Sequence, residues 1–314
     1  MKRRTCIGKL FQVLILACAV AACAHRPGSD VLVPVEQSGS ETVVEVFSAT
    51  NRASRSDAPG VFGTNRAARI SWEVFSVSIP PRHEAGNIEW PMGEPDPSKS
   101  FAIVGRDELT AEAFVNRITA GHRRRDVSVF VHGYNTRFQE GLFRQAQMAA
   151  DGDRDMAAIL FSWPSTGTLR GYAADREAAT FSRDHLVDLL AGLARDDRIG
   201  NIMVLGHSMG GWLTMEALRQ LRQTGQHRVI DRLEVILAAP DIDIDVFRAQ
   251  VQAIGALDPP LIVLVSTDDA ALRMSRRVNA DRLRIGAIDV SDPEVAAAVA
   301  GGDVMFVDIS EIQA

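Results

Sequence analysis

The sequence predicts an α/β protein whose mostly parallel sheet is covered by helices on both faces. From residue 100 onward, short apolar runs alternate with longer amphipathic stretches, a pattern typical of strands alternating with helices. A strand that returns through a helix to a neighbouring strand runs parallel to it. The apolar runs contain few polar residues, as expected of strands buried on both sides.

The expected elements follow in order along the chain. Helices are expected at residues 109–118, 139–150, 180–194, 211–223, 246–254 and 293–300. Strands are expected at residues 127–131, 157–163, 202–205, 233–239, 261–265 and 304–309. Two earlier strands, at residues 42–47 and 70–77, precede a loop rich in proline.

The pattern divides the chain into four parts. Residues 1–23 form a leader, and residues 24–40, rich in Gly, Ser and Pro, are expected to be a flexible tether. Residues 41–100 are expected to form an N-terminal extension of strands and loops. Residues 101–314 are expected to form the main α/β domain.

The leader has the composition of an export signal. Residues 2–4 are positively charged, residues 10–20 are apolar, and small residues lead to Cys23. The apolar stretch is shorter than the ~20 residues that span a bilayer. The stretch VAAC resembles the lipobox of bacterial lipoproteins, in which the cysteine is lipidated. We therefore expect an exported lipoprotein on the periplasmic side of a bacterial membrane. The alternatives are an ordinary secretory signal and lipidation at Cys18.

Composition excludes several classes of protein. The net charge of −6 over 314 residues gives no reason to expect a nucleic-acid partner. The three cysteines, Cys6, Cys18 and Cys23, all lie in the leader, so the rest of the chain has no disulfide, thiol nucleophile or thiolate metal site. Neither the H-E-x-x-H metal motif nor a glycine-rich nucleotide motif occurs, and we expect no metal and no cofactor.

The strongest chemical signal is the stretch GHSMGG at residues 206–211. It follows an apolar strand and precedes a helix, which is the context of a nucleophile elbow. The serine of an elbow sits in a strained turn where glycines avoid clashes, and the helix N-terminus favours a developing negative charge. We therefore expect Ser208 to be a nucleophile; a serine that only caps the helix is the alternative.

A second loop, VHGYN at residues 131–135, follows the strand at 127–131. In this architecture that loop supplies the second donor of an oxyanion hole. We expect the donors to be the backbone N–H groups of Met209 and Tyr134. Gly133 then permits close approach of the backbone to the substrate, and His132 braces the loop. A plain strand-to-helix turn is the alternative.

The acid of a catalytic triad is expected at the end of a later strand. Asp269 follows the strand at 261–265, and a carboxylate at that place would orient a base histidine. Asp241 and Asp243, after the preceding strand, are rival acids, and capping of a helix is the other explanation. The order of serine, acid and histidine along the chain favours Asp269.

The chain resembles α/β hydrolases of the DUF900 family of esterase- and lipase-like proteins. The resemblance rests on FVHGYNTRF, FSWPS, GHSMGG, LAAPDID and VSTDDAALRMSRR, with TNR and VSIPPRH upstream. It covers nearly all of the chain after the leader, and it implies an α/β-hydrolase fold and hydrolysis of carboxylic esters. It also implies that Ser208 is the nucleophile, that Asp269 is the acid and that His132 opens the oxyanion loop. It implies no substrate.

The base histidine of the triad has no obvious candidate. Such hydrolases carry it on a loop after the last strand, and no histidine follows His227. We expect the base to lie outside these 314 residues. If it lies within them, His132 is the first candidate, followed by His207 and His83.

The sequence thus predicts a serine hydrolase of carboxylic esters, anchored in the cell envelope and acting on a small-molecule or lipid ester. One alternative is a catalytically silent lipoprotein of the same fold that binds an envelope ligand or partner. Another is an acyltransferase, which forms the same acyl-enzyme but excludes water.

We predict that the mature protein begins at Cys23 and carries lipid there, because VAAC ends the leader and no later cysteine occurs. Mass spectrometry of the mature N-terminal peptide checks this. Cys23→Ser should abolish the lipid adduct, whereas Cys18→Ser should leave it in place. An unmodified terminus that begins at another residue would contradict the prediction.

Overall fold

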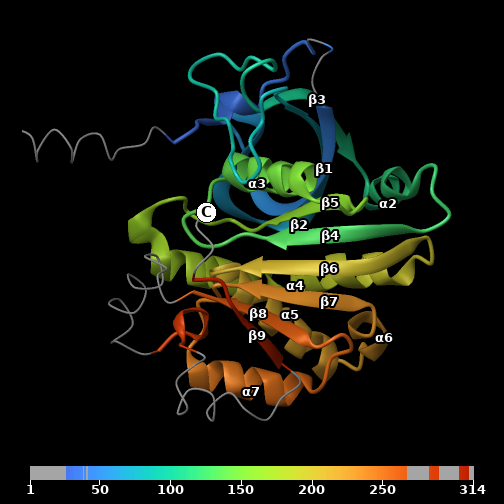
Figure 1. The fold of residues 1–314 in the computed structure, drawn as a ribbon, viewed down its shortest axis with the longest axis vertical. Coiled ribbons are helices and arrows are strands. Elements are labelled where there is room, and N and C mark those ends of the chain that lie inside the picture. Colours follow the sequence, from blue (N-terminus) through green and yellow to red (C-terminus); the bar gives the residue numbers. More distant parts are fainter. Residues whose placement is uncertain (1–25, 38, 40–41, 267–282, 290–303, 311–314) are drawn as a thin grey trace, which may run out of the picture.

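The fold is built on one mixed sheet, with strand order β3-β2-β1-β5-β4-β6-β7-β8-β9 (Figure 1). The computed structural model describes residues 26–37, 39, 42–266, 283–289 and 304–310. Strands β1 to β3 pair antiparallel, and all neighbours from β1 through β5 to β9 pair parallel. The prediction of a mostly parallel sheet is confirmed.

The elements have the following bounds. The strands are β1 (Thr42–Arg55), β2 (Ala58–Ile79), β3 (Ala102–Leu109), β4 (Arg125–Val131), β5 (Ala157–Ser162), β6 (Ile199–His207), β7 (Leu233–Ala238), β8 (Leu261–Val265) and β9 (Val304–Asp308). The α-helices are α2 (Ala111–Thr119), α3 (Phe138–Asp151), α4 (Tyr172–Arg195), α5 (Met209–Gln223), α6 (His227–Ile230) and α7 (Ile244–Ile254). Short 3-10 turns are η1 (Ser29–Leu32), η2 (Leu169–Gly171) and η3 (Ile285–Ala287).

Helices cover both faces of the sheet, α3 on one side and α4 and α5 on the other (Figure 1). Side chains along β4 point alternately into the two layers of the core. Val129 and Val131 pack into the cluster that contains α4 and α5, and Phe130 packs into the cluster that contains α3. Side chains of successive strand residues point to opposite faces, so a continuous apolar run supplies both layers, as the sequence indicated.

The expected N-terminal extension is instead part of the main sheet. β1 pairs parallel with β5, with Val46 opposite Ala158 and Thr50 opposite Ser162, and β2 and β3 continue the sheet beyond β1. The boundary predicted at residue 101 is therefore wrong, and the domain includes β1. An isolated hairpin is marginally stable in water, and pairing with β5 gives this one a buried face. Polar and apolar residues are mixed over residues 48–69, so the sequence pattern predicted only the first part of β1 and the last part of β2.

The described residues of the expected tether also pack on the domain. Val31 and Leu32 are each only 3% exposed, and η1 contacts β3 and α3. The N–H of Val35 donates to the carbonyl of Ile103 at 2.8 Å. A tether was expected because glycine, serine and proline predominate here, but two adjacent apolar side chains are enough to anchor the segment.

Several expectations fall outside the described residues: the leader with Cys23, the helix at 293–300 and the acid Asp269. Within the described ranges, no helix combines the length and the hydrophobicity needed to cross a bilayer.

Replacement of Leu32 measures how firmly the N-terminal segment is held. We predict that Leu32→Ala lowers the free energy of unfolding by about 2–4 kcal/mol, because it removes a buried side chain and leaves a cavity. The neighbouring Val33 is 61% exposed, so Val33→Ala should change stability by less than about 0.5 kcal/mol. Chemical denaturation of both variants gives the comparison. Equal, small effects would show that the segment is a tether after all.

Candidate active site

Ser208 occupies a strained turn between β6 and α5. Its backbone angles are φ 52° and ψ −120°, a region that costs a non-glycine residue about 1–3 kcal/mol. The turn is held on both sides. The Ser208 N–H donates to the carbonyl of Ala238 at 2.9 Å, and the Ser208 carbonyl accepts from Gly211 at 3.0 Å and from Asp241 at 3.2 Å. Strain maintained by such surroundings is typical of a functional position.

The glycines of GHSMGG are required by close packing around this turn. A Cβ on Gly210 would lie 2.1 Å from the carbonyl oxygen of Val131, and one on Gly206 would lie 2.7 Å from Thr214 Oγ1. The first turn of α5 therefore rests directly on the end of β4. This contact brings the elbow and the loop after β4 together, so the two motifs that the sequence singled out lie at one place.

The loop after β4 reaches Ser208 through Gly133. A Cβ on Gly133 would lie 3.1 Å from Ser208 Cβ and 3.0 Å from His207 Nδ1. Met209 is the first residue of α5, where a helix leaves backbone N–H groups without an intrahelical partner. The side chain of Tyr134 packs edge-on against Tyr172, with ring centres 5.4 Å apart. The N–H groups expected to hold an oxyanion thus belong to segments in direct contact.

His132 supports the loop from a buried position. It is 1% exposed and stacks on Trp163 at 4.9 Å, whose Nε1 donates to the His132 carbonyl at 2.8 Å. His132 Nδ1 lies 2.8 Å from the carbonyl oxygen of Gly133, and Nε2 lies 3.3 Å from Ser162 Oγ. These contacts fit the neutral tautomer with the proton on Nδ1. Burial, followed by the charge of Arg52, lowers the pKa of His132 to about 3.

Arg52, at 2% exposure, is the most buried cation of the site. Its Nε donates to Ser162 Oγ at 2.9 Å. One terminal nitrogen donates to the carbonyls of Gly63 at 3.2 Å and Ser165 at 3.0 Å. The other donates to the carbonyl of Thr136 at 2.8 Å and lies 3.5 Å from His132 Nε2. These contacts engage all five N–H groups of the guanidinium. Burial lowers the pKa of Arg52 to about 9, against the opposing effect of nearby carboxylates.

A buried carboxylate, Asp175 of α4, holds the same loop from another side. It accepts hydrogen bonds from the N–H of Asn135 at 3.0 Å, the N–H of Thr166 at 2.6 Å and the hydroxyl of Ser165 at 2.5 Å. Ser165 Oγ in turn accepts from the N–H of Thr136 at 3.1 Å. Asn135 has a positive φ of 56°, and the bond to Asp175 fixes its N–H in that conformation.

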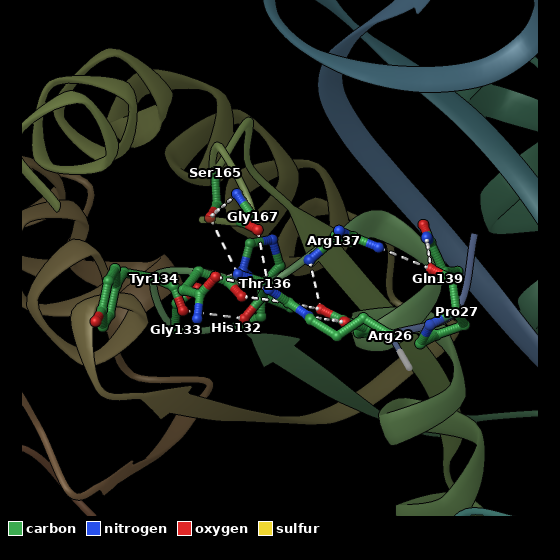
Figure 2. A network of polar contacts seen from close by, with 12 residues as sticks. Arg26, Pro27, His132, Gly133, Tyr134, Thr136, Arg137, Gln139, Ser165 and Gly167 are labelled. Carbon is green, nitrogen blue, oxygen red and sulfur yellow. Dashed lines mark hydrogen bonds and ion pairs between the residues drawn. The ribbon is translucent and has the colours of Figure 1, made fainter. Parts of the chain in front are cut away.

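The N-terminal segment adds a third support, shown in Figure 2. Arg26 donates to the Asn135 carbonyl at 2.7 Å, to Asn135 Oδ1 at 2.8 Å and to the Gly167 carbonyl at 2.9 Å. The same guanidinium forms an ion pair with Glu140 of α3. Pro27 follows, and its carbonyl accepts from Gln139 Nε2 at 2.7 Å. Arg26 therefore joins the start of the described chain to the loop beside Ser208.

The two rival acids occupy different positions. Asp243 caps α7, accepting from the N–H groups of Asp245 and Val246. Asp241 is 2% exposed and lies against the elbow, where Tyr172 Oη donates to it at 2.7 Å. Arg284 Nε lies 3.3 Å from Asp241 Oδ1. Asp269 lies outside the described residues.

Of the other described histidines, His207 lies beside the loop after β4, with Nδ1 3.0 Å from the position of a Cβ on Gly133, whereas the remaining four have partners elsewhere. His83 lies between Glu89 at 2.8 Å and Asp151 at 2.9 Å. Partial burial lowers the pKa of His83, but the hydrogen bonds to both carboxylates outweigh that effect and raise it. His185 contacts Asn51, and His122 contacts Arg125. His227 contacts Arg222. In the described part of the chain, no hydrogen bond joins a histidine to the Ser208 hydroxyl.

Sequence reasoning missed the buried charges that position the loop. Arg52 ends one of two TNR stretches, at residues 50–52 and 64–66, and nothing in the sequence indicated its burial. Asp175 lies before the predicted start of its helix, and Arg26 lies in the expected tether. The described residues contain no group of three or more His, Cys, Asp or Glu that could hold a metal ion.

A family model described as alpha/beta hydrolase of unknown function (DUF900) matches residues 107–314. The comparison with curated proteins gave no match. A predicted hydrolase from Agrobacterium vitis S4 shares 12% identity over 78% of this chain and 87% of its own, with a TM-score of 0.37.

Two esterase structures are similar at the same distant level. Esterase B from Lactobacillus rhamnosis shares 10% identity over 71% of this chain and 74% of its own, with a TM-score of 0.35. An esterase from Rhizomucor miehei shares 13% identity over 93% of this chain and 86% of its own, with a TM-score of 0.35. Similarity at this level says nothing about the substrate.

We predict that Arg52→Lys lowers the free energy of unfolding by about 2–4 kcal/mol, because a lysine has three donors and cannot satisfy the buried acceptors that the guanidinium holds. Arg55, on the same strand, is half-exposed and pairs with Asp57. Arg55→Lys should therefore change stability by less than about 0.5 kcal/mol. Urea denaturation distinguishes the two. If both substitutions are neutral, the buried network does not stabilise the loop.

Proposed function

Because the chain belongs to the DUF900 family of α/β hydrolases, we propose that it is a serine hydrolase of carboxylic esters with Ser208 as its nucleophile. One observation supports this proposal more strongly than the others. Ser208 has a positive φ in a turn where β6 ends and α5 begins, and the glycine-containing loop after β4 lies in contact with it. A partly exposed serine held in this strained geometry is what acyl transfer requires.

The proposed reaction proceeds through an acyl-enzyme. Ser208 Oγ attacks the ester carbonyl carbon, and the carbonyl oxygen gains negative charge as the tetrahedral intermediate forms. The backbone N–H groups of Met209 and Tyr134 donate to that oxygen, and such donors contribute about 2.7–4 kcal/mol each where they have been removed. The intermediate collapses with loss of the alcohol, and water then releases the acid and regenerates the serine.

The proton of Ser208 must be removed during the attack, which a histidine oriented by a carboxylate performs in a triad. We assign that carboxylate to Asp269. His132 does not fit the role of base, because its pKa of about 3 makes it a poor proton acceptor at neutral pH. Its contacts with Gly133 and Trp163 support the positioning role that we propose for it.

We also propose that lipid on Cys23 holds the enzyme at the envelope membrane, so that its substrate is a lipid ester or a small ester met there. The contacts of Arg26 with the loop beside Ser208 support this arrangement. Cys23 precedes Arg26 by three residues, and an extended chain advances at most ~3.6 Å per residue. A lipid at Cys23 would therefore lie within roughly 11 Å of Arg26.

A fluorophosphonate probe tests the nucleophile. We predict that the probe labels the mature protein at Ser208, that Ser208→Ala abolishes labelling and ester hydrolysis together, and that Ser98→Ala in an exposed loop changes neither. Ser208→Ala should leave the thermal unfolding midpoint nearly unchanged, because it deletes one hydroxyl at a turn.

Two outcomes would contradict the proposal. Absence of labelling in the wild-type protein would indicate a silent member of the fold. Transfer of the acyl group to an added alcohol, in place of release of the acid, would indicate an acyltransferase.

A further inference from the structure

A cavity of about 350 Å³ opens beside the elbow, on the face of the sheet that carries α3. We call it the Trp90 pocket, lined by Ile88, Trp90, Phe130, Gly133, Arg144 and His207, with Arg26, Pro27 and Glu140 at its side. Its size lies at the lower end of the range for small-molecule sites.

The pocket adjoins the turn that carries Ser208. Gly133 and His207 both line it, and a Cβ on Gly133 would lie 3.1 Å from Ser208 Cβ. The residue that forms this wall of the pocket therefore also contacts the elbow. Gly133 and His207 are therefore the residues that one arm of a molecule bound at Ser208 would pass to enter this cavity.

The walls next to this opening are apolar and firmly packed. Trp90 stacks on Phe143 with ring centres 5.3 Å apart and an interplanar angle of 24°, and Phe143 is fully buried. Phe130 of β4 closes the floor at 6% exposure. These rings suit an aliphatic chain, because burying apolar area from both partners is favourable at about 25 cal/mol per Å².

The two arginines of the pocket differ in how their charges are balanced. Arg26 is paired with Glu140, so the protein neutralises its charge. Arg144 donates to two neutral oxygens, Gln147 Oε1 at 2.8 Å and the Gly86 carbonyl at 3.4 Å. Partial burial lowers the pKa of Arg144, against the opposing charge of Asp151. Over the ranges that the structure describes, no carboxylate forms an ion pair with Arg144.

We propose that the Trp90 pocket binds an anionic arm of the substrate, with an aliphatic chain against Trp90 and Phe130 and a carboxylate or phosphate group on Arg144. This inference rests on the proposed function, because it places the ester carbonyl at Ser208. It narrows the substrate class to esters that carry a negative charge on one arm. A guanidinium without an acidic partner gains a charge-assisted hydrogen bond from such a ligand.

Binding can be measured without turnover by using the Ser208→Ala variant. The probes are the monomethyl and dimethyl esters of octanedioic acid, which have the same chain and differ by one carboxylate. Calorimetry should show that the monomethyl ester binds about tenfold more tightly, the size expected of one charge-assisted hydrogen bond. A phosphonate in place of the carboxylate then shows which anion fits better.

Substitution of Arg144 assigns that preference to one side chain. Arg144→Gln in the same background should abolish the preference for the monomethyl ester, and Arg144→Lys should keep most of it. Arg219→Gln, on α5 and about half-exposed, is the matched control and should have no effect. Thermal unfolding verifies that each variant is folded. If Arg144→Gln is not folded, the Arg144→Lys variant still allows the proposal to be tested. Equal binding of both esters by the Ser208→Ala protein would overturn the proposal.

Turnover separates this inference from the proposed function. In the wild-type background, Arg144→Gln should raise KM for the monomethyl ester about tenfold, with little change in kcat and no change for the dimethyl ester. If the protein prefers to bind the monomethyl ester but turns over neither ester, the proposal for the Trp90 pocket stands and the proposed hydrolase activity is rejected. Turnover of both esters with equal KM would retain the hydrolase and reject the pocket.

Discussion

The buried guanidinium of Arg52 fixes the arrangement of the sheet edge that carries Ser208. Burying a charge without a carboxylate partner is costly unless its hydrogen bonds are made, and here the acceptors come from separate segments, including Gly63, Thr136, Ser162 and Ser165. Displacing any one segment leaves a buried donor unsatisfied. The end of β5, the β1–β2 hairpin and the loop beside Ser208 therefore hold one another in place.

Asp175 complements this arrangement with the opposite charge. Arg52 binds carbonyl oxygens of the segments around the loop, whereas Asp175 binds N–H groups, those of Asn135 and Thr166. The two charges thus fix both kinds of backbone group over a short stretch of chain. Arg52 also helps to keep His132 neutral, so that this ring accepts at Nε2 while Nδ1 is directed to Gly133. The loop is thereby positioned before any substrate arrives, which is the condition that the proposed oxyanion hole requires.

The strained turn at Ser208 depends on this support. Its positive φ persists because the serine carbonyl and N–H are bonded to Gly211, Asp241 and Ala238, and because α5 rests on the end of β4 at Gly210. The N-terminal segment contributes through Arg26, which binds both the loop and α3. The site is consequently assembled from β1, β4, β5, β6 and the segment that begins at Arg26, although the family match begins only at residue 107.

The sequence by itself determined the parallel sheet, the position of most strands and helices and the two motifs that meet at the elbow. These features depend on local patterns: apolar periodicity, glycines at close contacts and the order of strand, loop and helix. Only the tertiary structure decided that the hairpin of β1 and β2 joins the main sheet, that Val31 and Leu32 anchor the expected tether, and that Arg52 is buried under the loop. Burial of a charged or isolated apolar residue depends on partners far away in the sequence, such as Arg52 with Ser162, and no local pattern records them.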